Sequence, residues 1–115
     1  MEHLSKRSLP EFLAHRPFSV VHIDADWDEH RPSLEEQLRR IEAEFDQRVS
    51  FGYVDCDAGQ DYARELGIRN MPSIAYYSGT ELFALVIGTQ QDIAANFGKM
   101  LRGESLNETN TLGQG

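Results

Sequence analysis

The chain has 115 residues and a single cysteine, with 11 Lys and Arg side chains against 19 Asp and Glu, for a formal net charge of −8. This length suits one domain with its own hydrophobic core. The negative charge disfavours nucleic acid and anionic membrane surfaces as partners. Because Cys56 is the only cysteine, the chain has no CxxC pair, intrachain disulfide or cysteine-rich zinc site.

The beginning of the chain predicts one helix and one strand. Ser8 and Glu11 have the three-residue spacing of a capping box, which predicts a first helix that ends near His15. Residues 18–25 are rich in β-branched and aromatic side chains and predict a strand. We find neither a signal peptide in the first 16 residues nor an apolar run long enough to span a membrane, so we expect a cytoplasmic protein.

A longer helix and a second strand follow. Ser33 and Glu36 form another capping box, which predicts the start of an amphipathic helix. Its apolar positions recur at helical spacing: Leu34, Leu38, Ile41 and Phe45. Residues 49–55 predict a strand.

The second half of the chain predicts a helix, a hairpin and a last helix. Residues 60–66 predict the helix, with Gly67 as its C-cap. Residues 73–77 and 81–87 predict two antiparallel strands joined by a short turn. The last helix shows one apolar face, formed by Ile93, Phe97, Met100 and Leu101. We expect residues 1–102 to form the domain and residues 103–115 a flexible tail.

The predicted order of elements is typical of an α/β fold. A βαβ unit followed by ββα predicts a mixed sheet of four to five strands with helices on both faces.

Four segments together resemble the thioredoxin family. They are VVHIDADWDEHR at 20–31, VDCD at 54–57, GIRNMPSIAYYSG at 67–79 and VIGT at 86–89. The resemblance spans about residues 9–101 and implies the thioredoxin fold. It also implies a cis peptide bond between Met71 and Pro72, with the Met71 backbone positioned to pair with an extended peptide.

The same resemblance places Trp27 at the family's tryptophan and the four residues Asp28, Glu29, His30 and Arg31 at its CxxC motif. Disulfide exchange needs a thiolate to attack and a second thiol to resolve the mixed disulfide. Neither is present in this motif. A carboxylate such as Asp28 still suits a helix N-terminus, where it is worth about 0.3–1 kcal/mol.

The family's buried Asp and nearby Lys, which handle protons, correspond here to His22 and Tyr53. We therefore expect a redox-inactive protein that is a monomer and binds no cofactor. We do not expect it to be an enzyme. Its expected role is to bind proteins or peptides noncovalently, or to act like a chaperone. The binding residues would be Trp27, Asp28, Glu29, His30, Arg31, Met71 and Pro72.

Two alternatives remain open at this point. His22 and Asp24 alternate onto the same side of a strand, so they form either a buried pair that neutralises itself or, with Asp28 and His30, a metal or acid/base site. Cys56 is either a structural cysteine or a lone reactive thiol, although its acidic neighbours would raise its pKa.

Overall fold

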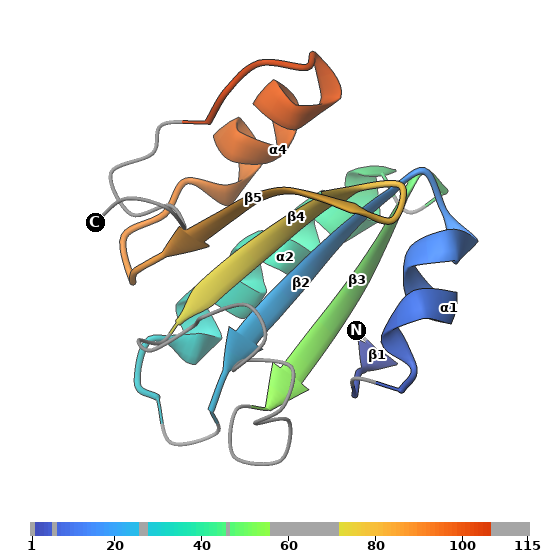
Figure 1. Cartoon of the computed structure of the whole chain (residues 1–115). Helices are drawn as coiled ribbons and strands as arrows, with labels where there is room; N and C mark the ends of the chain where they lie inside the picture. The colour runs from blue at the N-terminus through green and yellow to red at the C-terminus, as the bar shows by residue number, and fades with distance from the viewer. Residues whose placement is uncertain (1, 6, 26–27, 46, 56–71, 107–115) are drawn as a thin grey trace.

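The protein is a five-stranded mixed sheet with helices on both faces (Figure 1). A computed structural model describes residues 2–5, 7–25, 28–45, 47–55 and 72–106. The strands are β1 (Glu2–His3), β2 (Phe18–Asp24), β3 (Val49–Asp55), β4 (Ser73–Ser78) and β5 (Glu81–Ile87). The helices are α1 (Leu9–His15), α2 (Arg31–Phe45) and α4 (Ile93–Leu101).

The strand order is β1-β3-β2-β4-β5. Strands β1, β3 and β2 run parallel, while β4 and β5 pair antiparallel to their neighbours. The predicted mixed sheet is thus confirmed, and every predicted strand ends within one residue of its observed bounds. The helix predicted at 60–66 and its C-cap lie outside the described residues.

Both predicted capping boxes are wrong. The side chain of Ser8 makes no cap bond to α1; instead its Oγ accepts a hydrogen bond from the Ser5 backbone N–H at 3.0 Å. Ser33 lies inside α2, which begins two residues earlier, at Arg31. At the start of α2 it is Asp28 that supplies a side-chain acceptor, because its Oδ1 accepts a hydrogen bond from the His30 N–H at 3.1 Å.

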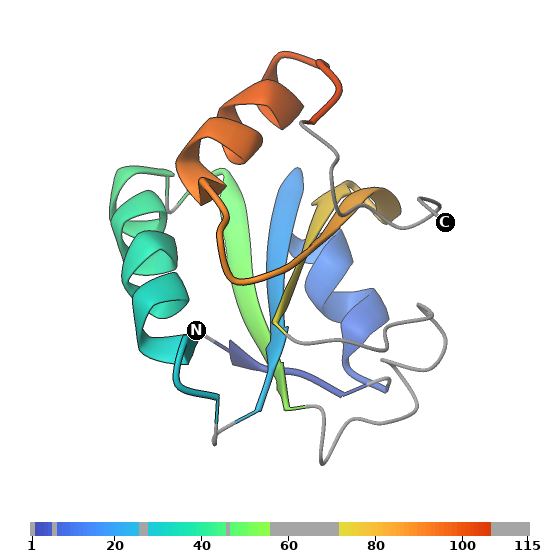
Figure 2. The same cartoon turned by 90° about the vertical axis from the view of Figure 1, so that its left-hand side faces the viewer.

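The two faces of the sheet are covered by different helices. Helices α2 and α4 cover one face and α1 covers the other (Figure 2). Successive strand residues alternate between the two cores, so Val20 and Tyr76 face α2 and α4 while Val21 and Tyr77 face α1. Tyr76 and Tyr77 are both buried, and neither contributes to an exposed aromatic patch.

Residues near both ends of the described chain pack against the rest of the protein. Leu106, four residues beyond the predicted domain end, is buried in the core shared with α2 and α4. Near the amino end, Leu4 packs directly over Gly52, and a Cβ added at Gly52 would also stand 3.0 Å from Phe12 Cζ.

In the part of the chain that the structure describes, we find no helix of the length and apolarity needed to cross a membrane.

Candidate functional site

Strands β2 and β3 end side by side next to the start of α2, and polar side chains gather there. His22 and Asp24 belong to β2, and His22 pairs in register with Tyr53 of β3. Asp24 pairs in the same way with Asp55. In open α/β sheets the carboxyl ends of parallel strands are the usual position of a functional site.

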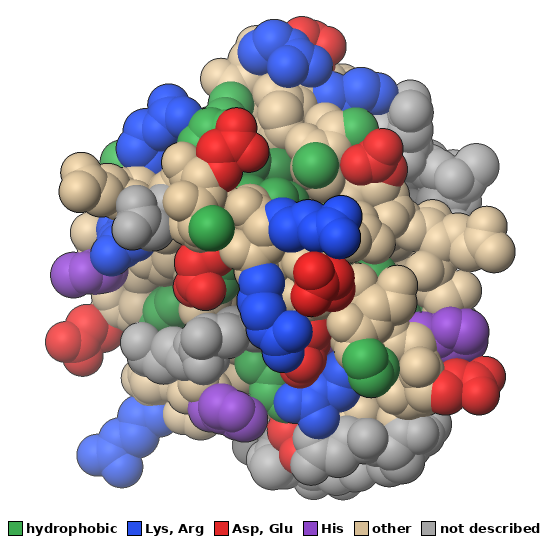
Figure 3. Space-filling view, turned by 180° about the vertical axis from the view of Figure 1, so that it is seen from behind, with side chains coloured by type: hydrophobic (Ala, Val, Ile, Leu, Met, Phe, Trp, Pro, Cys, Tyr) green, Lys and Arg blue, Asp and Glu red, His purple; other side chains and the backbone are tan. Residues whose placement is uncertain are grey.

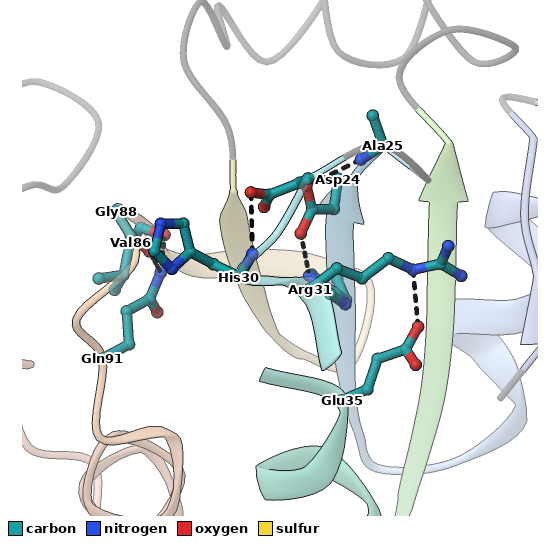
Figure 4. Close-up of polar contacts among 10 residues, drawn as sticks. Asp24, Ala25, His30, Arg31, Glu35, Val86, Gly88 and Gln91 are labelled. Carbon is teal, nitrogen blue, oxygen red and sulfur yellow. Dashed lines mark hydrogen bonds and ion pairs between the residues drawn. The ribbon is translucent and has the colours of Figure 1, made fainter. Parts of the chain in front are cut away.

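His22 and Asp24 form a hydrogen-bonded pair in the protein interior. His22 Nε2 lies 2.9 Å from Asp24 Oδ2, and both side chains are 0% exposed. The second carboxylate oxygen, Asp24 Oδ1, accepts from the Ala25 backbone N–H at 2.8 Å (Figure 4). Both oxygens of the carboxylate are therefore satisfied, as a buried charge requires.

Two opposing effects act on the Asp24 carboxyl. Burial raises its pKa, because a charge is poorly solvated in the interior. The hydrogen bonds with the His22 side chain and from the Ala25 N–H outweigh burial, so the pKa of Asp24 lies below its ordinary value of 3.8. Asp24 thus carries its negative charge inside the fold.

Tyr53 is the centre of a small group of rings. His22 lies in a T-shaped arrangement with the Tyr53 ring at a centroid distance of 5.5 Å, and His3 does so at 5.3 Å. The guanidinium carbon of Arg31 lies 4.4 Å from the same ring centroid. A cation over an aromatic face is attracted by the ring's negative face, so Tyr53 links β1, β2 and the start of α2.

Arg31 is fixed in place from its own helix as well. Its Nε donates to Glu35 Oε1 at 2.8 Å, one helical turn further on (Figure 4). Glu35 also lies 3.4 Å from Arg39. The Arg31 side chain is 23% exposed, so it covers Tyr53 more than it reaches into solvent.

The turn before α2 exposes some predicted site residues and buries others. The side chains of Glu29 and His30 are 87% and 50% exposed, and Glu29 Oε1 lies 3.5 Å from His30 Nε2. Asp28 is half-buried, and its Oδ2 has no hydrogen-bond partner among the described residues. The exposed surface of this turn is therefore formed by Glu29 and His30, while Asp28 holds the turn against α2.

Pro72 is buried at the start of β4, and its carbonyl accepts from the Gly88 N–H at 2.9 Å. Gln91 Nε2 donates to the carbonyls of Gly88, at 2.8 Å, and Val86, at 3.0 Å (Figure 4). These bonds tie the Pro72 end of β4 to the segment before α4. Trp27, Met71 and Cys56 lie outside the described residues.

The four residues of the metal alternative are not brought together as a ligand set. His22 and Asp24 are sealed in the interior, whereas His30 faces solvent. Among the residues with a described position, no group of three or more His, Cys, Asp and Glu side chains is arranged to hold a metal ion.

Sequence reasoning missed several participants in this site. It did not find the contact of Arg31 with Tyr53, the ion pair of Arg31 with Glu35 or the approach of His3. The i, i+4 spacing of Arg31 and Glu35 is a signal for the ion pair. The other two contacts join segments that are distant in sequence.

On the face that carries α2 and α4, acidic and basic side chains are interspersed (Figure 3). Three of the ion pairs there lie along α2 and join Arg39 and Arg40 to Glu35 and Glu36. Such exposed pairs contribute little to stability, and a mixed surface of this kind is typical of a solvated helix face.

Comparison with known proteins agrees with this arrangement. The thioredoxin family model matches residues 1–99. A search of curated proteins found no match. Among solved structures, thioredoxin f2 of Chlamydomonas reinhardtii superposes with a TM-score of 0.75 at 18% identity and covers 91% of this chain and 99% of its own.

A mutant thioredoxin from Halobacterium salinarum has a TM-score of 0.77 at 19% identity, over 91% of this chain and 92% of its own. Mitochondrial thioredoxin 3 of Saccharomyces cerevisiae, in its oxidized form, has a TM-score of 0.75 at 19% identity, over 85% and 92%. At these identities the likeness shows the fold, which is the thioredoxin fold expected from the sequence.

Proposed function

Because this chain belongs to the thioredoxin family but holds a single cysteine, we propose that it binds proteins or peptides noncovalently, as an adaptor or chaperone-like module. Dithiol-disulfide exchange needs two thiols in one motif, and the turn at 28–31 has none. The proposal assigns this turn and the adjoining Pro72 to recognition.

The observation that carries the proposal is the way the turn is built. Asp28 accepts backbone hydrogen bonds from His30, through Oδ1, and from Arg31, through its carbonyl at 3.3 Å. Arg31 is held in turn by Glu35 and Tyr53. The turn is therefore fixed without a disulfide, and the side chains of Glu29 and His30 remain available to a partner.

The interior beneath the turn also favours recognition over redox chemistry. A thioredoxin that transfers electrons needs a proton acceptor behind its thiols, and the resemblance assigns the corresponding positions to His22 and Tyr53. Here the His22 imidazole is hydrogen-bonded to Asp24 at 2.9 Å, and the Tyr53 ring lies against the Arg31 guanidinium. These groups lie beneath the turn and are sealed from solvent, because His22 and Tyr53 are both buried.

A peptide partner would lie across the exposed turn toward Pro72. By the family resemblance, the Met71 backbone would pair with the peptide as an added strand, with Trp27 beside it. Glu29 and His30 would then contact the partner's side chains.

The test is affinity capture with wild-type protein and the variants Trp27→Ala and Met71→Lys. Thr80→Lys is the matched control, because it adds the same charge as Met71→Lys on the exposed β4–β5 turn, at the opposite end of the sheet from Pro72. We expect partners of the wild type to be lost together from both site variants and retained by the control. Retention of every partner by all three variants would exclude peptide recognition at Trp27 and Met71.

The redox part of the proposal has its own assay. We expect the wild type to show no reduction of insulin disulfides above the level of dithiothreitol alone, and Cys56→Ser to behave identically. A thiol-dependent activity that disappears in Cys56→Ser would assign a residual redox function to this cysteine instead.

A further inference from the structure

One edge of the sheet is only partly covered. Strand β1 has two residues, and it pairs with β3 only at Gly52 and Tyr53. The first part of β3, from Val49 to Phe51, has no neighbouring strand on that side among the described residues. An uncovered edge presents backbone N–H and C=O groups that are able to pair with another chain.

The hydrogen bonds show which groups point outward. The Arg48 carbonyl accepts from Phe18 on the β2 side, whereas the Tyr53 carbonyl accepts from Leu4 N at 2.8 Å on the β1 side. Because backbone groups alternate between the two sides of a strand, Val49 and Phe51 point to the β1 side, like Tyr53. The amides of these two residues therefore face the uncovered edge.

A cavity of about 500 Å³ lies along this stretch of β3. Its lining includes Glu11 of α1, Arg16 directly after that helix, Glu42 of α2, and Val49 and Phe51 of β3. This volume is within the range of sites that hold small ligands or peptide side chains. The cavity is at the other end of β3 from the His22 and Asp24 pair, so it is separate from the site described above.

The edge already binds a cationic side chain of its own chain. Arg16 Nη1 donates to the Val49 carbonyl at 2.9 Å, in the position where a neighbouring strand would place an N–H. Glu11 and Glu42 line the same cavity and make no ion pair with another described residue. Apart from His15, Arg16 is the basic residue of the lining, so two carboxylates stand against one guanidinium.

We propose that this region, the β3 edge site, binds an extended segment of a partner protein that carries two adjacent Lys or Arg residues. The segment adds to β3 as a strand and bonds to the outward amides of Val49 and Phe51. Successive side chains of a strand point to opposite faces. One cationic side chain therefore meets Glu11 on the α1 face, and the next meets Glu42 on the α2 face.

The test uses a synthetic peptide, acetyl-Val-Lys-Arg-Val-Thr-amide, and amide hydrogen exchange measured by NMR on the full chain. We expect saturating peptide to slow exchange at Val49 and Phe51 and to leave Ser50, whose amide points toward β2, unchanged. A peptide with Glu in place of Lys and Arg, and one with N-methylated backbone amides, should give no slowing. If the amides of Val49 and Phe51 keep their exchange rates while the peptide binds, the β3 edge site is wrong.

The protein variants test the charge part of the proposal. We expect the double variant Glu11→Gln with Glu42→Gln to weaken peptide binding about fivefold, the loss expected for two exposed ion pairs. Glu44→Gln is the control. Glu44 is exposed on α2, the helix that carries Glu42, but does not line the cavity, so this variant should bind the peptide like the wild type. Equal weakening by the control would overturn the assignment of Glu11 and Glu42. Trp27→Ala changes a residue of the proposed recognition site and should leave this binding intact, which separates the β3 edge site from that recognition site.

Discussion

His22 and Asp24 stand two residues apart on one strand and are hydrogen-bonded to each other at 2.9 Å, with neither side chain exposed to solvent. The carboxylate also receives the Ala25 N–H, which begins the turn toward α2. The pair thus connects the interior of β2 to the segment that carries Asp28 and Arg31. The ionisation of Asp24 therefore affects the stability of the fold.

The first prediction concerns acid. The folded-state pKa of Asp24 is below 3.8, so its contribution to stability is fully present above that ordinary value and is lost as the pH falls through the folded value. Asp24→Asn should cost about 1–3 kcal/mol at neutral pH and should flatten the fall in stability below about pH 4. The measurement is the free energy of unfolding in urea across this range. Glu29→Gln is the control, because the Glu29 side chain is 87% exposed, and its free energy of unfolding should follow that of the wild type closely.

The second prediction concerns Arg31. Arg31→Ala removes both the bond to Glu35 and the contact with the Tyr53 ring, and it should cost about 1–2 kcal/mol of unfolding free energy. Arg31→Lys keeps the charge but not the planar group, so we expect it to recover only part of the loss. Arg40→Ala, at 77% exposure on the same helix, should change the unfolding free energy by less than about 0.5 kcal/mol. Full recovery by lysine would show that charge alone matters at this position.

The third prediction concerns the contact of Leu4 and Phe12 with Gly52. A methyl group at Gly52 would overlap the Leu4 side chain and crowd Phe12, so Gly52→Ala should cost about 1–3 kcal/mol. Gly98→Ala is a contrasting variant, because its added Cβ meets only the flexible end of Arg102, at 3.3 Å. In a helix this change should stabilise the protein by about 0.5–1 kcal/mol. Thermal unfolding of the two variants should therefore shift in opposite directions.

The fourth prediction reintroduces the missing chemistry. In a Cys56→Ser background, Asp28→Cys with Arg31→Cys places two thiols at the spacing of a CxxC motif, across the turn that leads into α2. We expect a disulfide to form, because the fold at this turn is that of the thioredoxin family. Insulin reduction should rise above background but stay slow, since the family resemblance assigns the positions of the proton relay to His22 and Tyr53. Thiol titration verifies that the disulfide has formed. Rapid turnover of insulin would show that the family's proton relay is dispensable in this protein.

Regular periodicity explains why most of the fold could be predicted. The concentration of β-branched and aromatic residues through 18–25 and 49–55 identifies strands, and the two-residue period of a strand correctly placed His22 and Asp24 on one side of β2. Strand β1 could not be found in this way, because two residues show no period. It exists because β3 offers it an edge and Leu4 packs over Gly52.

Helix starts were predicted less well, for a local reason. Ser33 and Glu36 have the spacing of a capping box, yet the helix begins at Arg31, where Asp28 satisfies the first amides instead. Several side chains compete for the same free N–H groups, and the tertiary fold selects among them. The contact of Arg31 with Tyr53 had no sequence signal, because the two residues lie on different elements brought together only by folding.

The position of β1 has a practical consequence for anyone handling this protein. His3 lies against Tyr53, and Tyr53 in turn lies against His22 and Arg31, so the first residues of the chain stand beside the candidate site. A polyhistidine tag fused to the amino end would bring imidazoles and a bound metal ion close to that site. Binding and metal titrations should therefore use protein from which any amino-terminal tag has been removed.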